Sequence, residues 1–121
     1  MAWRPAVRRT TGALAHKVTE LTASAGLTLD DIGRILDASP RSVARWQSGE
    51  VVPQRLNKQR LIELAYVAEA VTDVLPPEDA NVWMFTPSRA LNHDTPAERI
   101  RSGDFRSVLA LIEAMADGVV V

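Results

Sequence analysis

The most restrictive feature of the sequence is a spacer of only three residues, Asp37-Ala38-Ser39, between two short segments with helical periodicity. The first segment begins at Thr28, whose hydroxyl can cap the amide three residues on. In the second segment Ser39 is a capping residue, and Pro40 takes the first helical position, where the missing N–H of proline is no loss. Helices joined so tightly must cross at a steep angle, which is the geometry of a helix-turn-helix unit. The core positions expected in the first segment are Leu29, Ile32 and Leu36.

The other apolar patterns of the chain also repeat with helical spacing, and no segment alternates convincingly with period two. The longest pattern covers residues 56–75 and stops at the proline pair 76–77. A capping box, Thr95-Pro96-Ala97-Glu98, begins a short helix that Gly103 ends. The sequence therefore predicts an all-α fold. In the longest helix the expected core stripe comprises Leu61, Leu64, Ala65, Ala68, Val71 and Leu75, widened by Ile62 and Tyr66.

The proline pair is the best candidate for a boundary between two lobes, although the long helix belongs to both. We expect a basic arm over residues 1–10, a helix-turn-helix domain over residues 11–75 and a small helical lobe over residues 76–121. Residues 1–60 carry ten Lys and Arg against five Asp and Glu, whereas residues 61–121 carry four against ten. This asymmetry indicates a basic front that can meet phosphates and an acidic back that would avoid them, unless it is chance drift in a small protein.

The composition excludes several classes of protein. No apolar run approaches the roughly 20 residues that span a bilayer, and the chain has no cysteine, so we expect a cytoplasmic protein without a membrane partner. A Gly-rich phosphate loop, an HExxH motif and a nucleophile elbow are all missing. His16 and His93 have few potential partners nearby for metal or catalytic chemistry. We therefore expect no catalytic, metal or cofactor site, and a protein that acts by binding.

The helix expected after the spacer has two distinct faces. At about 100° per residue, Val43 and Trp46 share one face, and two arginines share another with a serine. The apolar face can anchor the helix, while arginines near its start can reach guanine edges in the major groove and its N-terminus can meet a phosphate. A solvated arginine face on an ordinary exposed helix is the alternative. The candidate DNA-binding residues are Ser39, Arg41, Ser42 and Arg45.

The chain ends on an apolar tail in which three valines follow a glycine. Gly118 can close the last helix and release Val119–Val121 in an extended direction. A self-packed end and simple fraying are the structural alternatives to a binding role. The apolar face of that last helix comprises Phe105, Val108, Ile112 and Met115.

Two segments also carry a resemblance to a known family. Residues 27–53 read LTLDDIGRILDASPRSVARWQSGEVVP, and residues 81–121 contain Trp83 followed by Pro87, the helix start at Thr95-Pro96, and a long amphipathic ending. The first segment resembles the Xre-type helix-turn-helix. The second resembles the toxin-binding domain of the Xre/MbcA/ParS antitoxins. The sequence is thus identified as a member of this antitoxin family.

The resemblance implies the antitoxin of a type II toxin–antitoxin pair. It implies a heteromeric complex with a RES-domain toxin that consumes NAD⁺, and this dinucleotide would be the toxin's substrate rather than a cofactor here. In this family the C-terminal lobe meets the toxin, and its end obstructs the active-site entrance. The residues from Trp83 to Phe85 become supports or contacts, and those from Met115 onward the blocking element. The toxin-binding residues implied are Trp83, Met84, Phe85, Ile112, Met115, Gly118, Val119, Val120 and Val121.

One departure from the family pattern bears on DNA. Many Xre domains place a glutamine early in the second helix, where it supports phosphate contact, but this chain has Leu29 followed by Asp30 and Asp31. Two carboxylates there would repel the DNA backbone. DNA binding is then weak, dependent on toxin, or lost in favour of self-association. The alternative function is a stand-alone helix-turn-helix repressor whose C-terminal lobe dimerises it.

Overall fold

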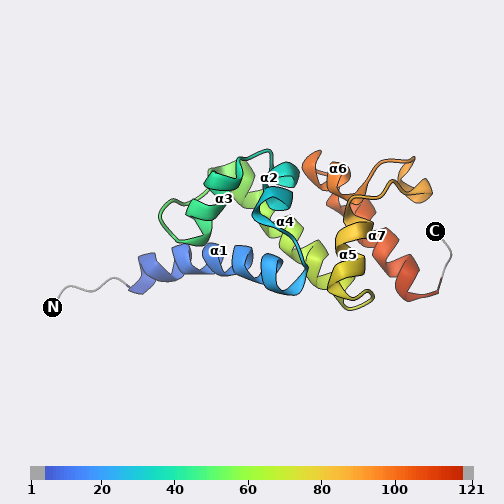
Figure 1. The fold of residues 1–121 in the computed structure, drawn as a ribbon, viewed down its shortest axis with the longest axis horizontal. Coiled ribbons are helices and arrows are strands. Elements are labelled where there is room, and N and C mark those ends of the chain that lie inside the picture. Colours follow the sequence, from blue (N-terminus) through green and yellow to red (C-terminus); the bar gives the residue numbers. More distant parts are fainter. Residues whose placement is uncertain (1–4, 119–121) are drawn as a thin grey trace.

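The computed structural model describes the backbone of residues 5–118 and the side chains from residue 12 onward. Over that range the chain forms seven α-helices and one short 3-10 helix, without a strand (Figure 1). The predicted all-α fold is therefore confirmed. None of the helices described is both long and apolar enough to cross a membrane. In chain order the elements are α1 (Pro5–Ser24), α2 (Leu29–Leu36), α3 (Pro40–Gln47), α4 (Arg55–Thr72), α5 (Pro77–Met84), η1 (Arg89–Leu91), α6 (Pro96–Arg101) and α7 (Phe105–Ala116).

Side-chain caps begin several of these helices where the sequence predicts them. The Thr28 hydroxyl accepts the Asp31 N–H at 3.0 Å, and the Asp31 carboxylate accepts the Thr28 N–H in return. Thr95 and Glu98 form the same reciprocal box. The Ser39 hydroxyl caps α3, which has proline at its first position. Because each such cap is worth about 1 kcal/mol, these residues fix the starts of α2, α3 and α6.

Two expectations differ from the structure at element ends, and one element was not predicted. The basic arm expected over residues 1–10 is helical from Pro5. Proline suits the first turn of a helix, and no other proline follows before α3. Residues 1–4 lie outside the described range. The long helix ends at Thr72 rather than at residue 75, because the Val74 N–H bonds to the Val71 carbonyl, an i→i−3 bond that tightens the last turn before the proline pair. The 3-10 helix η1 was not predicted, since three residues are too short to show a period.

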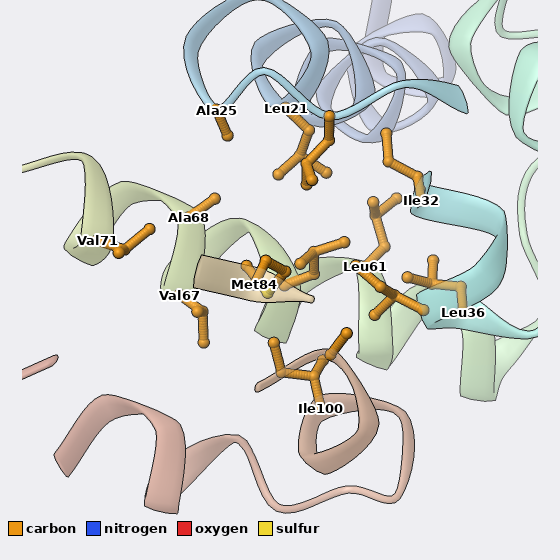
Figure 2. Close-up of a cluster of buried hydrophobic side chains, with 14 of the residues drawn as sticks. Leu21, Ala25, Ile32, Leu36, Leu61, Val67, Ala68, Val71, Met84 and Ile100 are labelled. Atoms are coloured by element: carbon orange, nitrogen blue, oxygen red, sulfur yellow. The ribbon is translucent and has the colours of Figure 1, made fainter. Parts of the chain in front are cut away.

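Helix α4 lies at the centre of a single continuous core. It contacts α1 and α2 on the helix-turn-helix side and α5, α6 and α7 on the other. Figure 2 shows Leu21 of α1 and Ile32 of α2 meeting Leu61 of α4, with Met84 of α5 and Ile100 of α6 completing the cluster. All five side chains are buried. The proline pair that marked a candidate boundary begins α5, with Pro76 as its N-cap and Pro77 as its first residue, and apolar packing continues across it.

Polar contacts also join α5 to the helix-turn-helix. The Asn81 amide donates to the Gly26 carbonyl at 3.0 Å and to the Asp31 carboxylate at 3.2 Å. The guanidinium of Arg34 lies over the Phe85 ring, 4.7 Å from its centroid. These contacts give α5 a fixed position relative to α2, so surfaces on the two halves of the chain are held in one geometry.

Candidate functional site

The helix-turn-helix depends on a glycine that the sequence interpretation did not single out. In the turn, Asp37 adopts the left-handed conformation (φ 57°), and the Ala38 N–H donates to the Gly33 carbonyl at 2.8 Å. A Cβ atom placed at Gly33 would overlap the carbonyl oxygen of Ala38. Only glycine lets the chain return so closely on α2. A small residue four positions before a predicted tight turn is the signal that could have identified it.

Helix α3 has the two faces predicted for it. Val43 and Trp46 are buried, with relative exposures of 0% and 5%, and they anchor the helix against the core. Arg41 and Arg45 are exposed on the outer side. The Arg45 Nε lies 3.6 Å from a carboxylate oxygen of Glu50, a loose pair open to solvent. The structure thus presents two arginines on one side of a firmly held helix.

The other two candidate DNA-binding residues are engaged in capping. The Ser39 hydroxyl accepts the Ser42 N–H and donates to the Ser42 hydroxyl, both at 3.0 Å. Asp31, one of the two carboxylates that argued against DNA binding, is held by its capping box and by Asn81. Asp30 is exposed. Neutral donors leave the charge of Asp31 in place, so both carboxylates remain at the start of α2, with the Arg34 guanidinium 3.9 Å from Asp31 as a partial counter-charge.

A second surface is a hollow of about 600 Å³ between α5, the loop that follows it and the end of α7. Trp83 and Met115, two of the residues expected to bind a toxin, line it together. Val82 adds an apolar side chain that is 65% exposed, and the sequence interpretation missed it. The signal that could have identified Val82 is an apolar residue on a helix that already has a buried stripe. The remaining lining residues are Leu75, Asp79, Thr86, Pro87, Ser88 and Arg89.

The chain leaves α7 close to this hollow. Gly118 has φ 80°, and its N–H donates to the Met115 carbonyl at 3.1 Å. This left-handed residue closes α7, as predicted for a glycine at a helix end. Val119, Val120 and Val121, the remaining residues expected to contact a toxin, lie outside the described range.

The other residues expected to bind a toxin point elsewhere. Met84 and Ile112 are core residues, 2% and 4% exposed. Phe85 is half-buried beneath Arg34 and lines a separate, smaller hollow. Trp83, Met84 and Phe85 are consecutive, so they leave the backbone in three directions. Of these three residues, therefore, only Trp83 lines the hollow.

A polar cluster centred on Arg99 holds this part of the molecule in shape. The Arg99 guanidinium donates to Asp94 at 2.8 Å, to Asp104 at 2.9 Å and to the Leu91 carbonyl at 2.8 Å. The hydrogen bonds with Asp94 and then Asp104 raise the pKa of Arg99, which stays charged. A 2.7 Å hydrogen bond from the Ser107 hydroxyl, joined by that of Arg99, lowers the pKa of Asp104. The cluster ties the loop after η1 to the start of α7.

The two histidines show no metal-site geometry. His16 faces Glu20 on the exposed side of α1, with 3.0 Å between Nε2 and the carboxylate, and His93 lies exposed in a turn. Among the residues that the structure describes, no group of three or more histidine or acidic side chains is placed to hold a metal ion.

Comparison with known proteins connects these surfaces to a family. Residues 68–118 match the family model described as the antitoxin Xre/MbcA/ParS C-terminal toxin-binding domain. The mycobacterial cidal antitoxins MbcA of Mycobacterium bovis and Mycobacterium tuberculosis are 61% identical over 108 residues, covering 89% of this chain and 96% of theirs. A probable mycobacterial cidal antitoxin of M. tuberculosis is 24% identical over 107 residues, covering 88% of this chain and 91% of that protein.

A solved structure gives the same assignment. A chain in the crystal structure of the M. tuberculosis MbcT–MbcA toxin–antitoxin complex matches with a TM-score of 0.81 and 61% identity, covering 89% of this chain and 97% of that one. The family match begins at residue 68, inside α4, so the matched segment includes the end of the long helix. The sequence resemblance is thereby confirmed, and this chain belongs to the Xre/MbcA/ParS family of antitoxins.

Proposed function

We propose that this antitoxin neutralises a toxin related to MbcT by binding it at the hollow between α5 and the end of α7. The observation that carries the proposal is that Trp83, Met115 and the exposed Val82 meet at one concave surface. All three lie inside the segment that matches the toxin-binding domain. Aromatic and methionine side chains are enriched at the centres of protein interfaces. The hollow therefore has the chemistry of a protein-binding site.

In this proposal the toxin is a RES-domain enzyme that consumes NAD⁺, and the C-terminal region closes its active-site entrance. Helix α7 is held at its start by the Arg99 cluster, so it can act as a rigid support. Gly118 has the left-handed conformation typical of a residue that ends a helix. Burying each of the three following valines would contribute roughly 1.5–3 kcal/mol before the cost of ordering them. Inhibition then needs neither catalysis nor a cofactor in this chain.

Two variants test this mode of inhibition in cells that co-express the toxin. Val82→Glu places a charge on the hollow, and deletion of residues 118–121 removes the proposed blocking element. Tyr66→Glu is the matched control, because Tyr66 is 63% exposed against 65% for Val82 but lies on α4. We expect both test variants to lose protection and the control to keep it. Full protection by both test variants would overturn the proposal.

The toxin chemistry needs its own measurement. Purified toxin is incubated with NAD⁺ alone, with the full-length antitoxin, and with each variant. We expect loss of NAD⁺ only where the antitoxin is absent or impaired. A toxin that leaves NAD⁺ unchanged would remove the RES-type assignment, while the binding results above would still decide the docking surface.

A second function, repression of its own operon in the cytoplasm, is favoured by the exposed arginine pair on α3. Arg41 and Arg45 lie on the outer side of a helix whose inner side is anchored. Gel shifts with the upstream DNA, with and without toxin, test it at several salt concentrations. We expect Arg41→Ala to weaken binding and Arg106→Ala, an exposed arginine on α7, to leave it unchanged. Strong operator binding without toxin, together with normal protection by Val82→Glu, would favour the stand-alone repressor.

A further inference from the structure

The hollow between α5 and the end of α7 is lined by two opposite charges as well as by apolar side chains. Asp79 lies in the first turn of α5, three and four positions before Val82 and Trp83, so these three residues share one face of the helix. Arg89 lines the same hollow from η1, beyond the end of α5. In chain order, the lining therefore passes from an acidic group through an apolar centre to a basic group.

Both charges are open to solvent. Asp79 and Arg89 are exposed, and neither belongs to the ion pairs that the described residues form with one another. A carboxylate in the first turn of α5 suits the helix dipole, but Arg89 has no such local reason. Residues 61–121 contain only four basic residues, of which Arg99 and Arg101 bind carboxylates of the chain. The charge of Arg89 is thus free to meet a partner.

We propose that the toxin segment that fills this hollow is apolar at its centre and carries a basic group that meets Asp79 and an acidic group that meets Arg89. The inference rests on the toxin-binding function proposed above and adds the chemistry of the partner segment. The two charges fix the direction in which that segment lies across the hollow. Asp79 and Arg89 are then specificity-determining residues, because a related toxin with the reverse order of charges is rejected.

The cost of covering charges supports this arrangement. A partner that covers Val82 and Trp83 must also approach Asp79 and Arg89, since all four side chains line one hollow. Removing an ion from water is costly unless an opposite charge takes the place of the water. Like charges that meet across an interface repel each other. A segment with complementary charges avoids both costs, whereas a wholly apolar segment or one with reversed charges does not.

The apolar centre and the two charges have different roles in binding. Val82 is 65% exposed, and covering it together with Trp83 supplies affinity. Exposed ion pairs add little affinity, but complementary charges raise the association rate and exclude wrong partners. Substitution of Val82 should therefore raise the dissociation rate. Substitution of Asp79 or Arg89 should lower the association rate and its dependence on salt.

Charge reversal tests the order of the charges in the full-length chain. Association and dissociation rates are measured with the purified toxin of the NAD⁺ assay, at low and at high salt. We expect Asp79→Lys and Arg89→Glu each to weaken binding about tenfold at low salt, mainly through slower association. The double variant keeps the net charge of the hollow but reverses the order of its charges. We expect its loss to be about a hundredfold, because the two sites act separately.

Asp30→Lys and Arg41→Glu are the matched controls. Both residues are exposed, and both lie in first turns of helices on the helix-turn-helix side. Asp30, like Asp79, is a carboxylate near a helix start, so its reversal reports the effect of the helix dipole on the melting temperature. Toxin binding by the controls should stay within about twofold of the original.

The same measurements separate failure of the charge order from failure of the hollow. Recovery of binding by the double variant would show that only net charge matters, and would overturn the inference. Single reversals that bind like the original, beside a Val82→Glu variant that does not bind, would also overturn it and leave the hollow as the docking surface. Normal binding by Val82→Glu would overturn both the inference and the proposed docking at the hollow.

Discussion

Helices α3 and α5 make an instructive comparison. Both are eight residues long and both have proline in the first turn, yet only α3 has a side-chain cap. The apolar and charged residues of α3 fall on opposite sides, and its exposed face could be predicted. The end of α5 is continuously apolar, and Trp83, Met84 and Phe85 face the hollow, the core and Arg34 respectively. Periodicity predicts a surface only where polar and apolar residues are segregated.

The two helices are also held by different means. The polar contacts that place α3 lie within a few residues of it, namely the Ser39 cap and the turn that closes on Gly33, while Val43 and Trp46 add apolar packing against the core. The position of α5 follows from contacts far along the chain, such as those from Asn81 to residues 26 and 31. Substitutions that remove one kind of contact should therefore affect the two surfaces differently.

The largest effect is expected at the turn that positions α3. Gly33→Ala should destabilise the protein by at least about 3 kcal/mol, because the new Cβ overlaps a backbone carbonyl that cannot move without opening the turn. Chemical denaturation measures the loss. Gly12→Ala is the matched control, since nothing lies within 4 Å of that position in α1, and it should stabilise by up to about 1 kcal/mol. Equal effects at the two glycines would contradict the role of the turn.

The next effect is expected around the proposed toxin-binding hollow rather than in the helix-turn-helix. Arg99→Ala removes three hydrogen bonds between the loop after η1 and the start of α7. We expect the melting temperature to fall by about 5 °C or more, with hydrogen exchange rising first in α6 and α7. Arg101→Ala removes an exposed pair with Asp37 and should change little. Uniform loosening of the whole chain by Arg99→Ala would show that the cluster supports the entire core instead.

A smaller effect tests the long-range placement of α5. Asn81→Ala removes the amide that bridges the Gly26 carbonyl and the Asp31 carboxylate, and should cost about 1–1.5 kcal/mol. Ser39→Ala, the corresponding local change at α3, should cost about 1 kcal/mol. Their consequences should differ, since only Asn81→Ala is expected to weaken toxin binding. Impaired toxin binding by Ser39→Ala alone would reverse the comparison.

The parts of the fold that could be predicted are those set by neighbours in sequence. The caps at Thr28, Ser39 and Thr95 need only residues up to three positions away, and all three are confirmed. A stripe on a single helix can likewise be found from its period. Whether another helix covers that stripe cannot be predicted from the period, because coverage is decided by the arrangement of the whole bundle. Ile62 and Tyr66 therefore looked like core residues and are exposed.

The candidate sites show the same limit. Arg99 binds Asp94 and Asp104, each five positions away, a spacing that belongs to no regular helix face. The role of Arg99 as the centre of this cluster depends on the turns on both sides of α6, which bring its partners together. The hollow joins Val82 and Trp83 to Met115 across more than thirty positions of sequence, a separation that no periodicity links. The family resemblance identified Trp83 and Met115, but the exposure of Val82 required the structure.

The smallest expected effect concerns acid stability at the start of α7. The Ser107 hydroxyl, and then Arg99, lower the pKa of the Asp104 carboxyl in the folded chain below the unfolded value of about 3.9. A lowered pKa stabilises the fold at pH values above the unfolded pKa, and this contribution disappears as the pH falls through the folded pKa. The difference in stability between the original protein and Asp104→Asn should therefore be constant above about pH 5 and shrink below about pH 4. Ser107→Ala should make this decline weaker, since it removes the main cause of the shift. If the difference instead grew on acidification, the carboxyl of Asp104 would have a raised pKa, and its assigned hydrogen bonds would be wrong.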